Sequence, residues 1–145
     1  MEIFISHPNS IEDFNAYYQL RWEVLRKPWS QPIDSEKDEF EHSSFHFMAK
    51  HNNKIIGVCR IQKNSELIAQ IRFMAVDAKY HGKGIGKKLI DAAEEFAKHQ
   101  LKSKFIILQA RENAVPFYKA CGYKIEEKTF LLYYSIQHFL MRRKI

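Results

Sequence analysis

The sequence predicts an α/β (α+β) fold, a mixed sheet flanked by helices, from three observations. Helical and strand-like segments alternate in the order helix, strands, helix, strand, helix, strand. A length of 145 residues suits one domain with a core of its own. No internal repeat or linker interrupts the pattern. We therefore expect a single domain over residues 1–145.

The first half of the chain predicts a helix, a loop and three strands. Apolar residues recur at helical spacing over Ile11–Lys27, Asn9 or Ser10 can cap this helix, and Pro28 ends it. The acidic and polar segment Ile33–Ser44 is typical of a loop. The expected strands are Phe45–His51, Lys54–Gln62 and Ala69–Val76. Asn52-Asn53 predicts a hairpin turn between the first two, because Asn tolerates positive φ.

The second half predicts two more helices and three strands. Gly82–Gln100 is amphipathic, with an apolar face of Ile85, Leu89, Ala92, Ala93 and Phe96. Phe105–Gln109 is almost continuously apolar, as in a strand buried on both faces. Asn113 can cap a helix that runs to Cys121, and Gly122 suits the position after its end. Final strands are expected at Phe130–Tyr134 and His138–Arg142.

The helix Gly82–Gln100 predicts how two strands are arranged. Parallel neighbours need a crossover connection, and this helix connects Ala69–Val76 to Phe105–Gln109. We therefore expect these two strands to be the one parallel pair of a twisted, mostly antiparallel sheet, and we expect the sheet to splay between them.

Charge and cysteine content limit the possible partners. The net charge of +6 allows nucleic acid, an acidic membrane or an anionic small ligand. The aromatic residues follow core periodicity instead of alternating with a basic stripe, so we expect no nucleic acid partner. No apolar run approaches ~20 residues and no signal peptide is visible, so we expect no membrane and a cytoplasmic location. Cys59 and Cys121 lack metal-ligand spacing, so we expect no metal and free thiols.

The strongest local signal is a glycine-rich loop. Strand-like Ile71–Val76 leads into His81-Gly82-Lys83-Gly84-Ile85-Gly86, which opens the long helix. Free amide hydrogens and the positive end of the helix dipole make such a start an anion site. Lys79, Lys83, Lys87 and Lys88 add positive charge. The spacing fits neither a dinucleotide-binding fingerprint nor a P-loop, because Lys88 stands where a P-loop has Ser or Thr.

Two ordered motifs resemble those of the GNAT acetyltransferase superfamily. His81–Gly86 resembles its acyl-CoA signature [Q/R]-x-x-G-x-[G/A], with His81 in place of Gln or Arg. Leu108–Tyr123, with Asn113, Tyr118 and the closing Gly122-Tyr123, resembles the family's downstream region. The tail Ile136-Gln137-His138-Phe139-Leu140-Met141 is similar to that of a small uncharacterised subgroup, with Gln137 where an I-P-H motif has proline. The splay would then lie between the fourth and fifth strands of the GNAT fold.

This resemblance implies direct acetyl transfer from acetyl-CoA (coenzyme A) to a primary amine in a ternary complex. The acceptor is a small molecule or a protein, and the enzyme is a monomer or a homodimer. Tyr118 would protonate or hydrogen-bond the coenzyme A thiolate, and the alternative is a core tyrosine on an amphipathic helix. The implied cofactor-binding residues are Met74, Ala75, Val76, His81, Gly82, Lys83, Gly84, Ile85, Gly86, Lys87, Asn113 and Tyr118.

The general base is the least defined part of the expected site. His138 is preferred because it lies in the tail motif and has a reference pKa of ~6.5. Other candidates are His46, Glu41 and Glu66. Arg21, Trp22 and Glu23 are expected either to line the acceptor site or to belong to an ordinary helix with one apolar face. The lack of an obvious base keeps an alternative function open, a catalytically silent acyl-CoA-binding or sensor module of the same fold.

Overall fold

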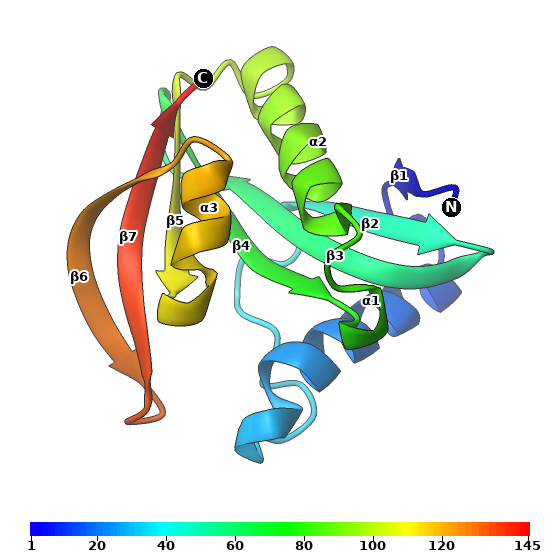
Figure 1. Cartoon of the computed structure of the whole chain (residues 1–145). Coiled ribbons are helices and arrows are strands. Elements are labelled where there is room, and N and C mark those ends of the chain that lie inside the picture. Colours follow the sequence, from blue (N-terminus) through cyan, green and yellow to red (C-terminus); the bar gives the residue numbers. More distant parts are fainter.

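The computed structural model describes residues 1–145 and has one seven-stranded sheet in the order β1-β2-β3-β4-β5-β7-β6 (Figure 1). The elements are β1 (Phe4–Ser6), α1 (Ile11–Leu25), η1 (Lys27–Trp29), β2 (Phe45–His51), β3 (Lys54–Lys63), β4 (Ile68–Val76), η2 (Ala78–Tyr80), α2 (Ile85–His99), β5 (Phe105–Arg111), η3 (Glu112–Ala114), α3 (Val115–Ala120), β6 (Lys124–Leu132) and β7 (Ile136–Lys144). Only β4 and β5 are parallel neighbours, which confirms the predicted mixed, mostly antiparallel sheet.

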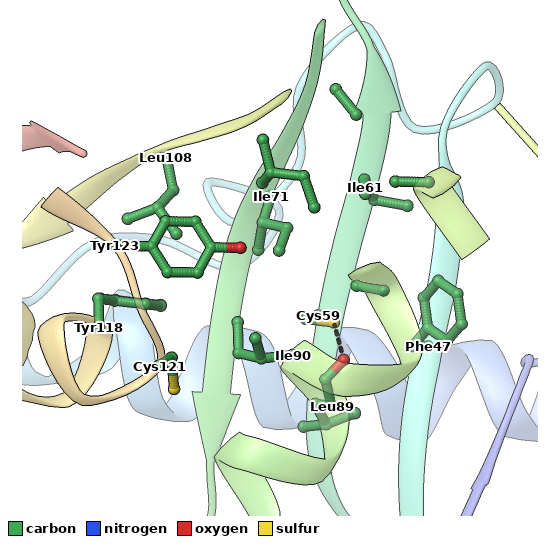
Figure 2. Packing of buried hydrophobic residues seen from close by; sticks show 14 of the residues in the cluster. Phe47, Cys59, Ile61, Ile71, Leu89, Ile90, Leu108, Tyr118, Cys121 and Tyr123 are labelled. Atoms are coloured by element: carbon green, nitrogen blue, oxygen red, sulfur yellow. Dashed lines mark hydrogen bonds between the residues drawn. The ribbon is translucent and has the colours of Figure 1, made fainter. Parts of the chain in front are cut away.

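Two hydrophobic clusters cover opposite faces of the sheet. The larger one packs α2 and α3 against the strands, and Figure 2 shows Leu89 of α2 next to Cys59 of β3 in this cluster. The smaller one packs α1 against the other face. The sheet therefore separates the glycine-rich loop and α3 from α1. None of the helices combines the length and the hydropathy that crossing a bilayer requires.

The first half of the chain folds largely as its sequence predicts. Ser10 caps α1 by accepting a hydrogen bond from the Asp13 amide. Asn52 and Asn53 both have positive φ, at 48° and 64°, and form the hairpin turn. The helix ends at Leu25, two residues before the predicted end, because the chain then enters the 3₁₀ turn η1. The strand β1 is absent from the sequence prediction, since three residues carry too little pattern to indicate a strand.

The long helix begins later than predicted. It starts at Ile85, whereas Gly82 and Gly84 lie before it with φ of 76° and 79°. These left-handed conformations favour glycine and are incompatible with an α-helix. The glycines therefore form the turn that leads into the helix.

The last third contains the other corrections. Phe105, Ile107 and Gln109 of β5 are half-buried, so this strand is not buried on both faces as expected. The helix predicted from Asn113 is split into η3 and α3, and neither has a side-chain cap, so the capping role of Asn113 is wrong. Tyr133 and Tyr134 form the β6–β7 turn with φ of 52° and 58° and are not strand residues. Both terminal strands, β6 and β7, are longer than predicted. The start of β6 was missed because this strand is mostly exposed and shows little apolar periodicity.

Candidate functional site

The sheet opens between β4 and β5. The two strands pair from Ile68↔Phe105 to Ile71↔Leu108, and no pairing joins them beyond that point. Figure 1 shows the strands diverging toward their carboxyl ends, with α3 beside β5. The later backbone groups of β4 on this edge are therefore free to bind an extended ligand, as an added strand would.

A bulge turns the backbone of β4 at the opening. The β3–β4 register shifts between Val58 and Arg60, so that Phe73 and Met74 together stand opposite Cys59. Phe73 has a φ of 55°, the left-handed region that a bulky residue rarely adopts. Bulges re-aim side chains and interrupt ladder pairing, often next to active sites. Here Met74 faces the opening, whereas Ala75 is buried and Val76 is half-buried.

The glycine-rich loop leaves an open, positively polarised helix start. A Cβ on Gly82 or Gly84 would meet no atom within 4 Å, so both backbones are accessible. Gly84 is the N-cap of α2 and has no side chain to satisfy the first helical amides, which begin at buried Ile85. Gly86 serves packing instead, since its Cβ would lie 3.0 Å from the Phe117 ring of α3.

The side chains around this loop do not converge on one anion site. The His81 Nε2 donates to the Val76 carbonyl at 3.0 Å, which fastens the loop to the end of β4. Lys83 is exposed. Lys87 is exposed and ion-paired with Asp91 one turn along the helix. The groups of this loop that could bind an anion are therefore mainly its backbone amides.

A cavity of about 390 Å³ fills the opening between β4 and β5. It brings together residues from α1, β4, β5, η3, α3, β6 and β7. Its lining residues are Leu25, Arg26, Gln70, Ile71, Arg72, Phe73, Met74, Leu108, Gln109, Ala110, Arg111, Ala114, Tyr118, Phe130, Leu132 and His138. Both expected catalytic residues, Tyr118 and His138, therefore line one cavity although they come from different elements.

Tyr118 reaches the cavity from α3. The residue is only 7% exposed and packs edge-on against Phe117 and Tyr123. Figure 2 shows Tyr118 near Tyr123 and Cys121 in this core. Burial raises the pKa of its phenol, and no hydrogen bond offsets that shift. The hydroxyl is therefore protonated at neutral pH and available as a proton donor.

His138 reaches the cavity from β7. Its ring stacks on Phe130 at 4.3 Å, and its Nδ1 lies 3.0 Å from the Ile136 carbonyl. A carbonyl only accepts, so Nδ1 carries the proton and Nε2 keeps the lone pair of the neutral ring. Burial, together with the nearby Arg111 and Arg26 guanidinium groups, lowers the pKa of His138 from 6.5. The imidazole is therefore neutral at pH 7 and can accept a proton at Nε2.

The other candidate bases lie elsewhere. The His46 ring bonds to the Tyr17 hydroxyl at 2.9 Å and to the Glu41 carbonyl at 2.8 Å in the layer between α1 and the sheet. The Glu41 carboxylate accepts from two buried arginines, Arg21 at 2.9 Å and Arg60 at 2.8 Å. Neither His46 nor Glu41 lines the cavity. Glu66 is exposed in the β3–β4 turn.

Two further expectations about the site are not met. Arg21 is fully buried, Trp22 donates to the Gln31 carbonyl and Glu23 is exposed, so none of the three lines the cavity. The next turn of α1 supplies Leu25 and Arg26 instead. Asn113 is exposed on η3 and also lies outside the cavity lining.

Three arginines of the cavity were not found by sequence reasoning. Arg26, Arg72 and Arg111 come from the end of α1, from β4 and from the end of β5. No motif links these positions, because only the tertiary fold brings them together. The one available signal was that Arg72 and Arg111 lie on or next to the two strands that border the predicted splay.

The model of the Acetyltransferase (GNAT) family matches residues 14–123. The chain belongs to the GNAT acetyltransferase family. The uncharacterized N-acetyltransferase YjcF of Bacillus subtilis is 33% identical over 118 residues, covering 81% of this chain and 82% of that protein. The crystal structure of Escherichia coli ElaA shares the fold with a TM-score of 0.81, at 22% identity over 98% of both chains. An aminoglycoside 6'-N-acetyltransferase complexed with coenzyme A shares it with a TM-score of 0.80, at 13% identity over 99% of this chain and 97% of that one.

Proposed function

We propose that this GNAT protein is an N-acetyltransferase that moves an acetyl group from acetyl-CoA to a primary amine by direct transfer in a ternary complex. The observation that carries the proposal is the convergence of Tyr118 and His138 on the cavity where β4 and β5 part. One residue holds a proton and the other lacks one at neutral pH. Such a pair can deprotonate the attacking amine and protonate the departing thiolate.

The binding of acetyl-CoA rests on backbone features. The glycine-rich loop offers uncapped amides at the start of α2 to a pyrophosphate, with open space above Gly82 and Gly84. The free edge of β4 after Ile71 suits an extended pantetheine arm, and Met74 lies at its inner end. The likeness to a fold neighbour complexed with coenzyme A supports the same choice. Acetyl-CoA supplies the activated acetyl group as a thioester.

The proposed transfer balances with the residues at hand. The amine nitrogen bonds to the acetyl carbonyl carbon and the carbon–sulfur bond breaks. His138 Nε2 accepts a proton from the amine, and the Tyr118 hydroxyl gives a proton to the departing sulfur. The products are an amide and the free thiol of coenzyme A, and solvent restores both residues.

Release of free thiol from acetyl-CoA in the presence of a panel of amines tests this function. We expect amine-dependent thiol release and an acetylated product of matching mass. The alternative, a silent acyl-CoA-binding module, predicts calorimetric binding of acetyl-CoA without release for any amine. Absence of binding at millimolar acetyl-CoA contradicts both.

A further inference from the structure

The lining of the cavity is rich in cationic side chains. Arg26, Arg72 and Arg111 line it beside His138, and the lining includes no carboxylate. Its other polar side chains are the neutral amides of Gln70 and Gln109. An acceptor with several ammonium groups would therefore meet like charge here, whereas an acceptor with an anionic group would meet opposite charge.

Arg26 and Arg111 have no carboxylate partner within the chain. Arg111 donates to the Leu25 carbonyl at 3.0 Å and lies 4.4 Å from the centre of the Trp29 ring. Arg26 donates to the carbonyls of Ser35 and Leu25, each at 3.0 Å. These contacts hold the two guanidinium groups in place without neutralising them. Burial and the adjacent Arg26 both lower the pKa of Arg111, so the pair is electrostatically unfavourable as it stands.

The neighbouring buried arginines, unlike Arg26 and Arg111, have carboxylate partners within the chain. Arg21 and Arg60 are completely buried, and the chain supplies carboxylates to both, from Glu41 and Asp38, at 2.6–2.9 Å. Arg72, at the edge of the cavity, shares Asp38 at 3.1 Å. This fold therefore neutralises the arginines that serve its interior. Of the three arginines that line the cavity, Arg26 and Arg111 have no carboxylate from the chain and are left for a ligand.

We propose that the acceptor is a small amine that carries a carboxylate, and that Arg111 and Arg26 bind this carboxylate. Guanidinium groups are suited to carboxylates because they form two parallel hydrogen bonds. Arg111 and His138 stand directly opposite each other in the β5–β7 ladder, so their side chains share one face of the sheet. In an α-amino acid the amine and the carboxylate are attached to the same carbon. A carboxylate bound by Arg111 therefore brings the amine near His138. This inference rests on the proposed function and specifies its acceptor.

Matched acceptors test the proposal directly. The common L-amino acids are compared with their carboxamides, which keep the amine and the side chain but lack the negative charge. We expect kcat/KM to favour the acid of at least one pair by roughly 10-fold or more, as for a hydrogen bond to a charged group. R111Q and R26Q should lose that preference, measured within each variant as the ratio of kcat/KM for the acid to kcat/KM for its amide, because this ratio cancels any effect of the substitution on His138 that both acceptors share. R142Q is the control, because Arg142 lies on β7 outside the cavity and stacks on Phe105 at 4.0 Å.

The outcomes separate this proposal from the proposed function. If amides or simple amines are acetylated as fast as the acids, and R111Q slows both classes by the same factor, the proposed acetyltransferase function is supported and the carboxylate site is wrong. If no amine is acetylated, calorimetry of the amino acids with coenzyme A-saturated protein decides. Binding that R111Q and R26Q abolish, but R142Q does not, supports the site, and no binding by any amino acid overturns it.

Discussion

The two sides of the cavity are built from different parts of the chain. The side where we propose that acetyl-CoA binds, called the cofactor side, is almost entirely backbone, from the bulge at Phe73 and Met74 to the glycines before Ile85, within one continuous segment. The opposite side consists of side chains such as Arg26, Arg111 and His138, from three separate elements. Binding by backbone groups should survive most side-chain substitutions but not the replacement of a glycine. Binding by side chains should be lost when those side chains are substituted.

The largest effect is expected on the backbone side, from Gly84→Asp. Two like unit charges 4 Å apart repel by about 4 kcal/mol at a partly hydrated site, which corresponds to roughly a 1,000-fold loss of affinity. The new Cβ also occupies the open approach to the helix start. We expect no calorimetric binding of acetyl-CoA. The fold should survive, because Asp tolerates the left-handed region better than most residues.

Gly84→Asn is the matched control for that change. It has nearly the same shape and the same backbone tolerance without the charge, so its affinity should lie between those of wild type and Gly84→Asp. Normal affinity in Gly84→Asp would mean that the pyrophosphate binds elsewhere.

Tyr118→Phe separates the chemistry from binding. The substitution keeps the ring and its packing against Tyr123 and removes only the hydroxyl. General acid catalysis contributes about 10²–10⁴-fold, so kcat should fall by that factor while the affinity for acetyl-CoA changes little. A fall below about threefold would make Tyr118 a packing residue and would leave water as the proton source.

His138→Gln gives an effect of similar size with a pH signature. Burial, with the nearby Arg111 and Arg26, lowers the pKa of His138 below its usual 6.5, which favours the neutral ring near pH 7. The kcat of the wild type should therefore stay constant near neutral pH and fall on an acidic limb whose midpoint lies below 6.5. The variant should lose about 10²–10⁴-fold in rate and lose that limb. An unchanged limb in His138→Gln would assign it to another group.

The smallest effect on acetyl-CoA affinity is expected from Lys87→Gln, which changes a side chain on the proposed cofactor side. The ammonium is exposed and already paired with Asp91. Its attraction to a bound pyrophosphate is screened by water and salt, so the Kd for acetyl-CoA should rise by no more than about fivefold at low salt and less at 0.5 M salt. A loss as large as that of Gly84→Asp would show that lysine side chains, and not backbone amides, hold the anion.

The same contrast explains how much the sequence could predict. The long connecting helix and the parallel β4–β5 pair could be predicted from patterns in consecutive residues, and the structure confirms both. The anion site at the glycine-rich loop stays a prediction. The exact start of α2 was missed because the left-handed φ of Gly82 and Gly84 has no apolar signature. Asn113 looked like a helix cap, yet the 3₁₀ turn at this point places Ala114 at the helix start.

The acceptor side could not be predicted from local patterns. Arg21 and Arg26 both lie near the end of α1, and in the sequence nothing distinguishes the environment of one from that of the other. Only the packing of α1 on the sheet buries Arg21 against Glu41 and turns Arg26 into the cavity. Likewise, the place of Arg111 opposite His138 depends on the β5–β7 register, which the sequence does not encode locally. His138 itself was found through the tail motif, and its role as the base remains a prediction.

Calorimetric titration of acetyl-CoA into Gly84→Asp and His138→Gln, side by side with wild type, tests the division of the cavity most directly. The account predicts that Gly84→Asp shows no binding heat. It also predicts that His138→Gln binds with a Kd within about threefold of wild type, because the base acts on the amine and not on the cofactor. Loss of binding in His138→Gln, or wild-type binding in Gly84→Asp, would contradict a backbone cofactor side and a side-chain acceptor side.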